Sequence, residues 1–80
     1  MKVDWDHLQF FLVLARTKTL TNAARIIGVE HSTVARRIQA LELALGMTLF
    51  KREASGYELT MEGLALVPLV EQMEQAFLQI

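Results

Sequence analysis

Apolar residues recur at helical spacing between positions 31 and 45. Intervals of four, three and four separate Val34, Ile38, Leu41 and Leu45. This spacing places the four side chains along one face of a predicted helix, which would pack on a core. The opposite face collects small and polar side chains, namely Ser32, Ala35, Arg36 and Gln39.

A shorter helix is predicted before this one, over residues 20–27, with Thr19 or Thr21 as its N-cap. Gly28 can adopt the left-handed conformation that ends a helix and turns the chain. Two helices joined in this way have the form of a helix-turn-helix, which places its second helix in the major groove of DNA. The alternative is an ordinary pair of helices with a charged outer face.

A first helix is expected from Asp4 or Asp6 to about Arg16, and it is apolar on more than one face. Its contribution to the domain's own core would be Leu8, Phe11, Leu12 and Ala15. We expect Phe10 and Leu14 to need another cover, either the last helix or a second subunit.

Two short strands are predicted after Gly46, over residues 49–52 and 57–59, with a turn between them. They would form a wing beside the helix-turn-helix, and the alternative is an ordinary surface hairpin. Arg52 and Ser55 would lie near the tip of the wing, where they could contact a phosphate or the minor groove.

The last helix would begin at Thr60, and Pro68 should kink it near Leu64. A heptad-like stripe follows, made of Leu66, Val70, Met73, Phe77 and Ile80. Such a stripe favours pairing with a second copy of the chain, with packing onto its own domain as the alternative. The predicted fold is therefore mainly α, with a winged helix-turn-helix over 1–59 and a dimerisation helix over 60–80.

Charge is distributed unevenly along the 80 residues. The whole chain has a formal net charge of −1, yet residues 16–52 hold seven basic and two acidic residues, a net +5. Residues 53–80 hold five glutamates and no lysine or arginine. A basic middle and an acidic tail indicate a DNA-facing module followed by a segment that faces elsewhere. The apolar content of 52% favours a surface that a partner covers.

Several functional classes are disfavoured. Cysteine is absent, and His7 and His31 lack the spacing of metal ligands. No apolar run approaches the ~20 residues of a membrane span, and the N-terminus carries acids where a signal peptide would be apolar. We find no nucleophile with a base, no paired carboxylates and no glycine-rich phosphate loop. We therefore expect a cytoplasmic protein that is not an enzyme and uses no cofactor or metal.

The chain resembles the N-terminal DNA-binding domain of LysR-type transcriptional regulators over nearly all of residues 4–80. The matching segments are HLQFFLVLA, LTNAARIIGV, TVARRIQALELALGMTLFKR and YELTMEGLALVP. This resemblance implies a winged helix-turn-helix, a linker helix that pairs subunits, and a C-terminal effector-binding domain that this chain lacks. It implies a fragment of a longer regulator, whose full-length form could be a tetramer.

Family roles carried over by position give a candidate site. Arg36 matches the arginine of the recognition helix, and Arg52 matches the arginine that follows the Leu-Phe pair. Glu30 and Ala35 depart from the family, which usually has serine at both positions, and His31 replaces a usual glutamine. Ser55 stands where a basic residue is frequent. The expected DNA contacts are Thr21, Asn22, His31, Ser32, Thr33, Ala35, Arg36, Arg37, Arg52 and Ser55.

The sequence thus predicts a bacterial transcription regulator's DNA-binding domain that reads a roughly palindromic operator on double-stranded DNA as a homodimer. The alternative is a helical dimerisation module whose basic face binds an acidic protein.

Overall fold

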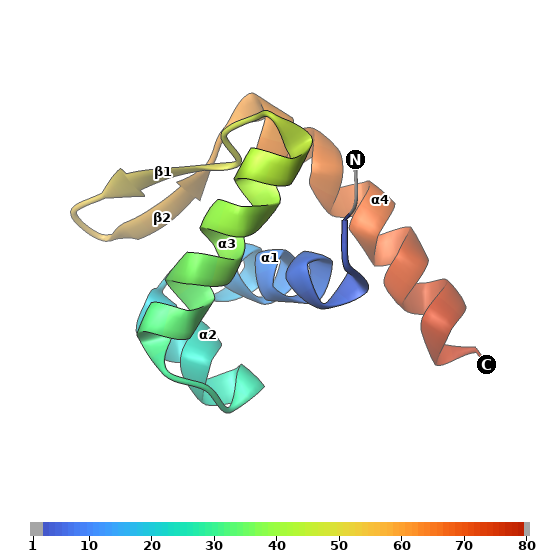
Figure 1. Cartoon of the computed structure of the whole chain (residues 1–80), viewed down its shortest axis with the longest axis horizontal. Coiled ribbons are helices and arrows are strands. Elements are labelled where there is room, and N and C mark those ends of the chain that lie inside the picture. The colour runs from blue at the N-terminus through green and yellow to red at the C-terminus, as the bar shows by residue number, and fades with distance from the viewer. Residues whose placement is uncertain (1–2, 80) are drawn as a thin grey trace.

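The computed structural model describes residues 3–79, and its elements follow the predicted order (Figure 1). Three helices come first, then a two-stranded antiparallel sheet, then a long helix. The bounds are Trp5–Thr17 for α1, Leu20–Ile27 for α2, His31–Leu45 for α3, Phe50–Glu53 for β1, Gly56–Leu59 for β2 and Met61–Leu78 for α4. The mainly helical class with a small wing is confirmed.

Local chemistry sets the turn between α2 and α3. The Thr19 hydroxyl accepts a hydrogen bond from the Asn22 backbone N–H at 3.1 Å, so Thr19 rather than Thr21 caps α2. Gly28 ends that helix in the left-handed region, with φ at 88°. Glu30 precedes α3 as its N-cap residue, but its carboxylate makes no capping hydrogen bond. The start of α3 therefore leaves a free carboxylate beside its first turn.

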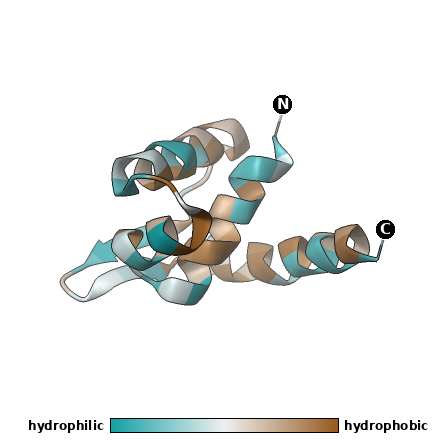
Figure 2. Ribbon diagram, turned by 90° about the horizontal axis from the view of Figure 1, so that it is seen from below, coloured by the Kyte–Doolittle hydropathy of each residue, from teal (hydrophilic) through white to brown (hydrophobic). Residues whose placement is uncertain are grey.

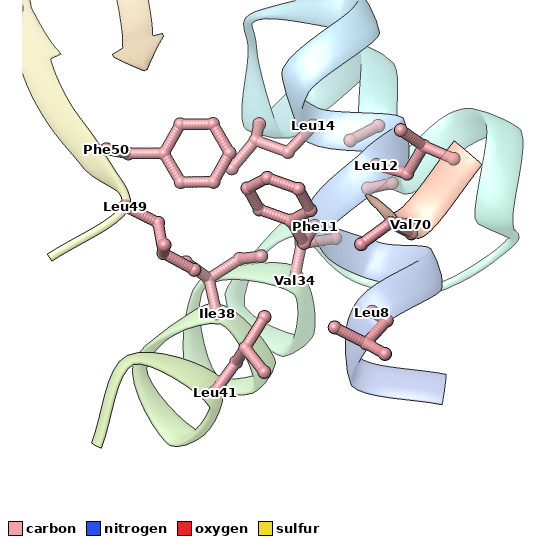
Figure 3. Close-up of a cluster of buried hydrophobic side chains, with 12 residues drawn as sticks. Leu8, Phe11, Leu12, Leu14, Val34, Ile38, Leu41, Leu49, Phe50 and Val70 are labelled. Atoms are coloured by element: carbon pink, nitrogen blue, oxygen red, sulfur yellow. The ribbon is translucent and has the colours of Figure 1, made fainter. Parts of the chain in front are cut away.

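The core surrounds α1, which contacts α2, α3, α4 and β2. The Phe11 ring is fully buried and lies 5.5 Å from the Phe50 ring, centroid to centroid. Leu14 is also fully buried beside these rings (Figure 3), within the chain's own core. The expectation that it needs the last helix or a second subunit as its cover is therefore wrong. Phe10 is half-buried against the same core.

The first half of α4 belongs to this core. Val70 is fully buried (Figure 3). Leu66 and Val67 are partly buried and pack against the same core cluster. Gly63 is buried too, and it lies so close to Leu49 that a Cβ there would overlap the Leu49 carbonyl oxygen. We expected Val70 to lie in a seam between two subunits. This expectation is corrected, because the Val70 side chain is fully buried within its own chain. The stripe turns inward here because this part of α4 packs against α1.

Hydrogen bonds at Thr60 fix the start of α4. Its hydroxyl accepts from the Gly63 backbone N–H at 3.1 Å and donates to the Thr48 carbonyl oxygen at 2.6 Å. This confirms Thr60 as the cap of the last helix. The helix runs on through Pro68, and a kink near Leu64 stays a prediction.

An ion pair ties α1 to the second half of α4. The Arg16 guanidinium donates two hydrogen bonds to Glu74, at 2.9 and 3.2 Å, and lies 3.5 Å from a Glu71 oxygen. The hydrogen-bonded guanidinium lowers the pKa of the Glu74 carboxyl, and Glu74 raises the pKa of Arg16. The acidic tail therefore neutralises one cation that the charge pattern assigned to the DNA-facing region.

Candidate nucleic-acid interface

One exposed stripe runs along α3 on the side away from the core. The stripe, spaced at four, three and four residues, consists of Ser32, Arg36, Gln39 and Leu43. The buried Val34, Ile38 and Leu41 hold the opposite side of the helix. Within residues 3–79, Arg36 forms neither an ion pair nor a side-chain hydrogen bond. Its guanidinium is available to an outside partner.

A groove of about 280 Å³ separates α3 from the wing. Ala35 and Gln39 line it from α3, and Arg52 and Tyr57 line it from the two strands. Arg52 and Tyr57 are cross-strand neighbours, and the guanidinium carbon lies 5.6 Å from the centroid of the Tyr57 ring. This contact orients the exposed Arg52 side chain along the wing, on the same side of the molecule as the α3 stripe.

Glu42 fixes the distance between α3 and the wing. One of its carboxylate oxygens accepts hydrogen bonds from the backbone N–H groups of Leu49, at 2.7 Å, and Phe50, at 3.3 Å. These two donors lie where the chain enters β1, so the carboxylate anchors the wing to α3. Sequence reasoning counted Glu42 only as a charge. The available signal was its helical position, beside the apolar face of the helix predicted over 31–45 and seven residues before Leu49.

A second anchor joins the wing to the end of α1. The Tyr57 backbone N–H donates to the Lys18 carbonyl oxygen at 2.7 Å. Gly56 comes so close to this carbonyl that a Cβ would overlap it, and its φ of 140° also favours glycine. The wing is therefore held at two points, by α3 and by the junction of α1 and α2.

The other expected contacts lie at the first turns of α2 and α3 and at the tip of the wing. The exposed ones are Thr21, Asn22, His31, Ser32 and Ser55, whereas Thr33 is half-buried. The wing and the α2–α3 region occupy one end of the molecule, and the last turn of α4 occupies the other (Figure 1). All ten residues expected at the interface therefore belong to α2, α3 and the wing, away from the last turn of α4.

Arg37 has a role inside the fold that the sequence did not reveal. Its guanidinium carbon lies 5.4 Å from the centroid of the Phe10 ring, and its side chain is only partly exposed. Arg37, on α3, thereby covers part of the Phe10 ring, whose expected cover was the last helix or a second subunit. It lies on the flank of α3 away from the wing, and a phosphate contact from this position stays a prediction.

A second surface, which we call the α4 patch, lies far from the wing. A hollow of about 480 Å³ is lined by Trp5, Met73, Ala76 and Phe77. The Phe77 ring lies 6.1 Å from the Trp5 ring, centroid to centroid, and Phe77 is 56% exposed. Apolar segments recur along α4 to its far end (Figure 2). Ile80, which the sequence placed on the same seam, lies outside the described residues.

Across residues 3–79, no three His, Asp or Glu side chains come together in a group that could hold a metal ion. None of the helices the structure describes is both long and apolar enough to cross a membrane.

Relatives of the chain are transcription regulators. The family model described as bacterial regulatory helix-turn-helix protein, lysR family, matches residues 5–64. The sequence is 34% identical over 71 residues to a carbapenem-hydrolyzing β-lactamase transcriptional activator of Serratia marcescens, covering 89% of this chain and 24% of the relative. It is 36% identical over 62 residues to the regulator PcaQ of Agrobacterium fabrum, covering 78% of this chain and 20% of that one. The chain thus spans about a quarter or less of these relatives' lengths.

Solved structures show the same fold. A complex of the CbnR DNA-binding domain with DNA superimposes with a TM-score of 0.91 at 27% identity, covering 96% of this chain and 88% of that one. A complex of the BenM DNA-binding domain with catB site 1 DNA gives a TM-score of 0.92 at 25% identity, with coverages of 96% and 86%. With the family match over three quarters of the sequence, these likenesses show that the chain belongs to the LysR family of bacterial regulatory helix-turn-helix proteins.

Proposed function

We propose that this chain is a sequence-specific DNA-binding domain of a bacterial transcription regulator. The exposed stripe on α3 carries the proposal, because Arg36 stands on it unpaired within the described residues, beside a groove that leads to Arg52. A helix with a narrow polar face fits the major groove, and a wing beside it can reach the flanking backbone. The DNA complexes of the similar CbnR and BenM domains support the same partner.

Each element has its own part in this docking. Arg36 would pair with a guanine through both guanidinium nitrogens, and the small Ala35 would let the helix approach the bases closely. His31 and Ser32 would lie near the base edges at the start of α3, and Thr33 beside them. Phosphates would be held by Thr21, Asn22, Arg37, Arg52 and Ser55. We place the protein in the cytoplasm with the bacterial chromosome, and we assign it no catalytic step and no cofactor.

Selection from a pool of randomised duplexes, followed by sequencing of the bound fraction, tests this function. The expected result is an enriched motif with two related half-sites, bound more tightly than unrelated DNA. The same measurement at several salt concentrations should show affinity falling as salt rises. Absence of enrichment, with no binding to any duplex at low salt, would contradict the proposal and favour an acidic protein as partner.

The wing supplies a prediction about affinity. Arg52→Ala should weaken binding to specific and unrelated duplexes alike, and should flatten the dependence of log affinity on log salt by about one unit. The reason is that an exposed arginine on a wing contacts backbone phosphate, which carries no base identity. Fluorescence anisotropy on both duplexes measures it. Lys51→Ala removes a neighbouring cation from the opposite face of β1 and should change binding less. A loss confined to the specific duplex would make Arg52 a base reader.

We also propose that two copies of the chain pair through the α4 patch. Leu66 and Val70 pack on the chain's own core, so the surface left for a partner is shifted around the helix toward Leu69, Met73 and Ala76. Phe77 continues this surface along α4, and Trp5 is its contribution from α1. Pairing through this surface would place the two α3 helices at a fixed spacing, matching half-sites separated by whole turns of DNA.

Met73→Asp should abolish pairing and leave the monomer folded. Met73 is 45% exposed, so a carboxylate there stays hydrated in the monomer but would be buried without a partner in the dimer. The expected cost of several kcal/mol would weaken dimerisation at least ~100-fold. Sedimentation velocity measures it, with Gln75→Asp on the other side of α4 as the matched control. A Met73→Asp variant that still dimerises like the wild type would place the dimer contact elsewhere.

A further inference from the structure

Lys18 occupies a backbone conformation that favours glycine. Its φ is 69°, and within the described residues it is the one non-glycine residue with a positive φ. A side chain at such a position raises the free energy of the fold, which glycine would avoid. Stability alone therefore does not explain a lysine here.

Two backbone hydrogen bonds hold Lys18 in place. Its N–H donates to the Leu14 carbonyl oxygen at 2.8 Å, which closes the end of α1. Its carbonyl oxygen accepts from the Tyr57 N–H at 2.7 Å, and Gly56 packs against the same carbonyl. The backbone of Lys18 is thus fixed between the end of α1 and the start of α2, where it bonds to β2 of the wing.

The Lys18 side chain is exposed and uncommitted. Among residues 3–79, no carboxylate lies within 4.0 Å of its ammonium group, and the two ion pairs both belong to Arg16. The wing acids Glu53 and Glu58 form no ion pair with Lys18. A free cation is therefore held between two elements expected to touch DNA.

We propose that the Lys18 ammonium binds a backbone phosphate of the DNA, in the space between the start of α2 and the wing. Expected phosphate contacts flank it on both sides, at Thr21 on α2 and at Arg52 on the wing. Its position off α3 keeps it away from the base edges, and a lysine on a flexible stem acts on phosphate as a point charge. The assignment rests on the proposed DNA-binding function. It adds a phosphate contact at Lys18, which we call the clamp, between the expected phosphate contacts at Thr21 and Arg52.

Lys18→Gly separates the clamp from a structural role, because the two predict opposite signs. Glycine relieves the left-handed backbone, so the melting temperature should rise. Loss of the ammonium should lower affinity for the selected duplex about fivefold at 0.1 M salt and reduce the salt slope by about one unit. Lys18→Arg should keep both affinity and slope near the wild-type values, since it keeps the charge.

Arg16→Gln is the control for net charge. It removes one positive charge two residues away, but from a side chain that pairs with Glu74 on α4. Its salt slope on DNA should match that of the wild type. Unchanged affinity and slope in Lys18→Gly, while the wild type binds the duplex, would overturn the clamp and leave the DNA-binding function standing. A wild type that binds no duplex would overturn both.

Discussion

Gly63→Ala is expected to destabilise the folded chain by about 3 kcal/mol or more. A Cβ at this position would overlap the Leu49 carbonyl oxygen and press on the side chain of Leu59. The Leu49 backbone cannot move away freely, because its carbonyl oxygen accepts the Thr60 N–H at 3.0 Å and its N–H donates to the Glu42 carboxylate. Urea unfolding followed by circular dichroism measures the loss.

Gly46→Ala is the matched control for this substitution. Gly46 has a φ of 68°, but no atom lies within 4 Å of the Cβ that alanine would add. The control therefore carries the backbone strain of a left-handed alanine without any overlap. It should lower the free energy of unfolding by about 1 kcal/mol. Equal losses in the two variants would mean that α4 does not sit against Leu49 as closely as the structure places it.

Arg36→Ala is expected to weaken binding to the selected duplex by about 1–3 kcal/mol, roughly 5- to 150-fold. Arg36 stands on the outward stripe of α3, on the same side of the molecule as the wing, and has no partner among residues 3–79. Binding to unrelated duplexes should change less. A repeated selection with the variant should show relaxed base preference at one position in each half-site, because a bidentate contact to guanine is lost.

Arg25→Ala provides the comparison for Arg36→Ala. Arg25 is an exposed arginine in the last turn of α2, so its removal changes the net charge equally. We expect it to leave base preference unchanged. If both variants lost affinity equally on every duplex and kept the wild-type motif, Arg36 would be a backbone contact.

Local features account for the parts of the fold that could be predicted. The cap at Thr60 and the left-handed Gly28 act within a few residues of their own position, so sequence spacing is enough to place them. The cap of α2 was narrowed to Thr19 or Thr21, and the structure selects Thr19. The outward stripe of α3 was predictable for the same reason, since helical period alone separates Arg36 from Ile38. The wing strands were placed within one residue of their observed bounds.

Long-range contacts account for what the sequence did not reveal. The stripe along α4 has the same spacing whether it faces another subunit or its own domain, and Val70 proves to face its own core. Arg16 and Glu74 are separated by 58 residues, so the charge pattern could not show that they pair. The two anchors of the wing, at Glu42 and Lys18, likewise depend on segments brought together by the fold.

Chemical-shift mapping of the ¹⁵N-labelled chain, titrated with its selected duplex, tests the central claim most directly. Binding through α3 and the wing predicts the largest amide shifts over residues 31–39 and 51–57, with smaller ones at the start of α2. Residues 73–77 of the α4 patch should shift little. Large shifts confined to the α4 patch, with residues 31–39 unmoved, would contradict the assignment of α3 as the helix that reads DNA.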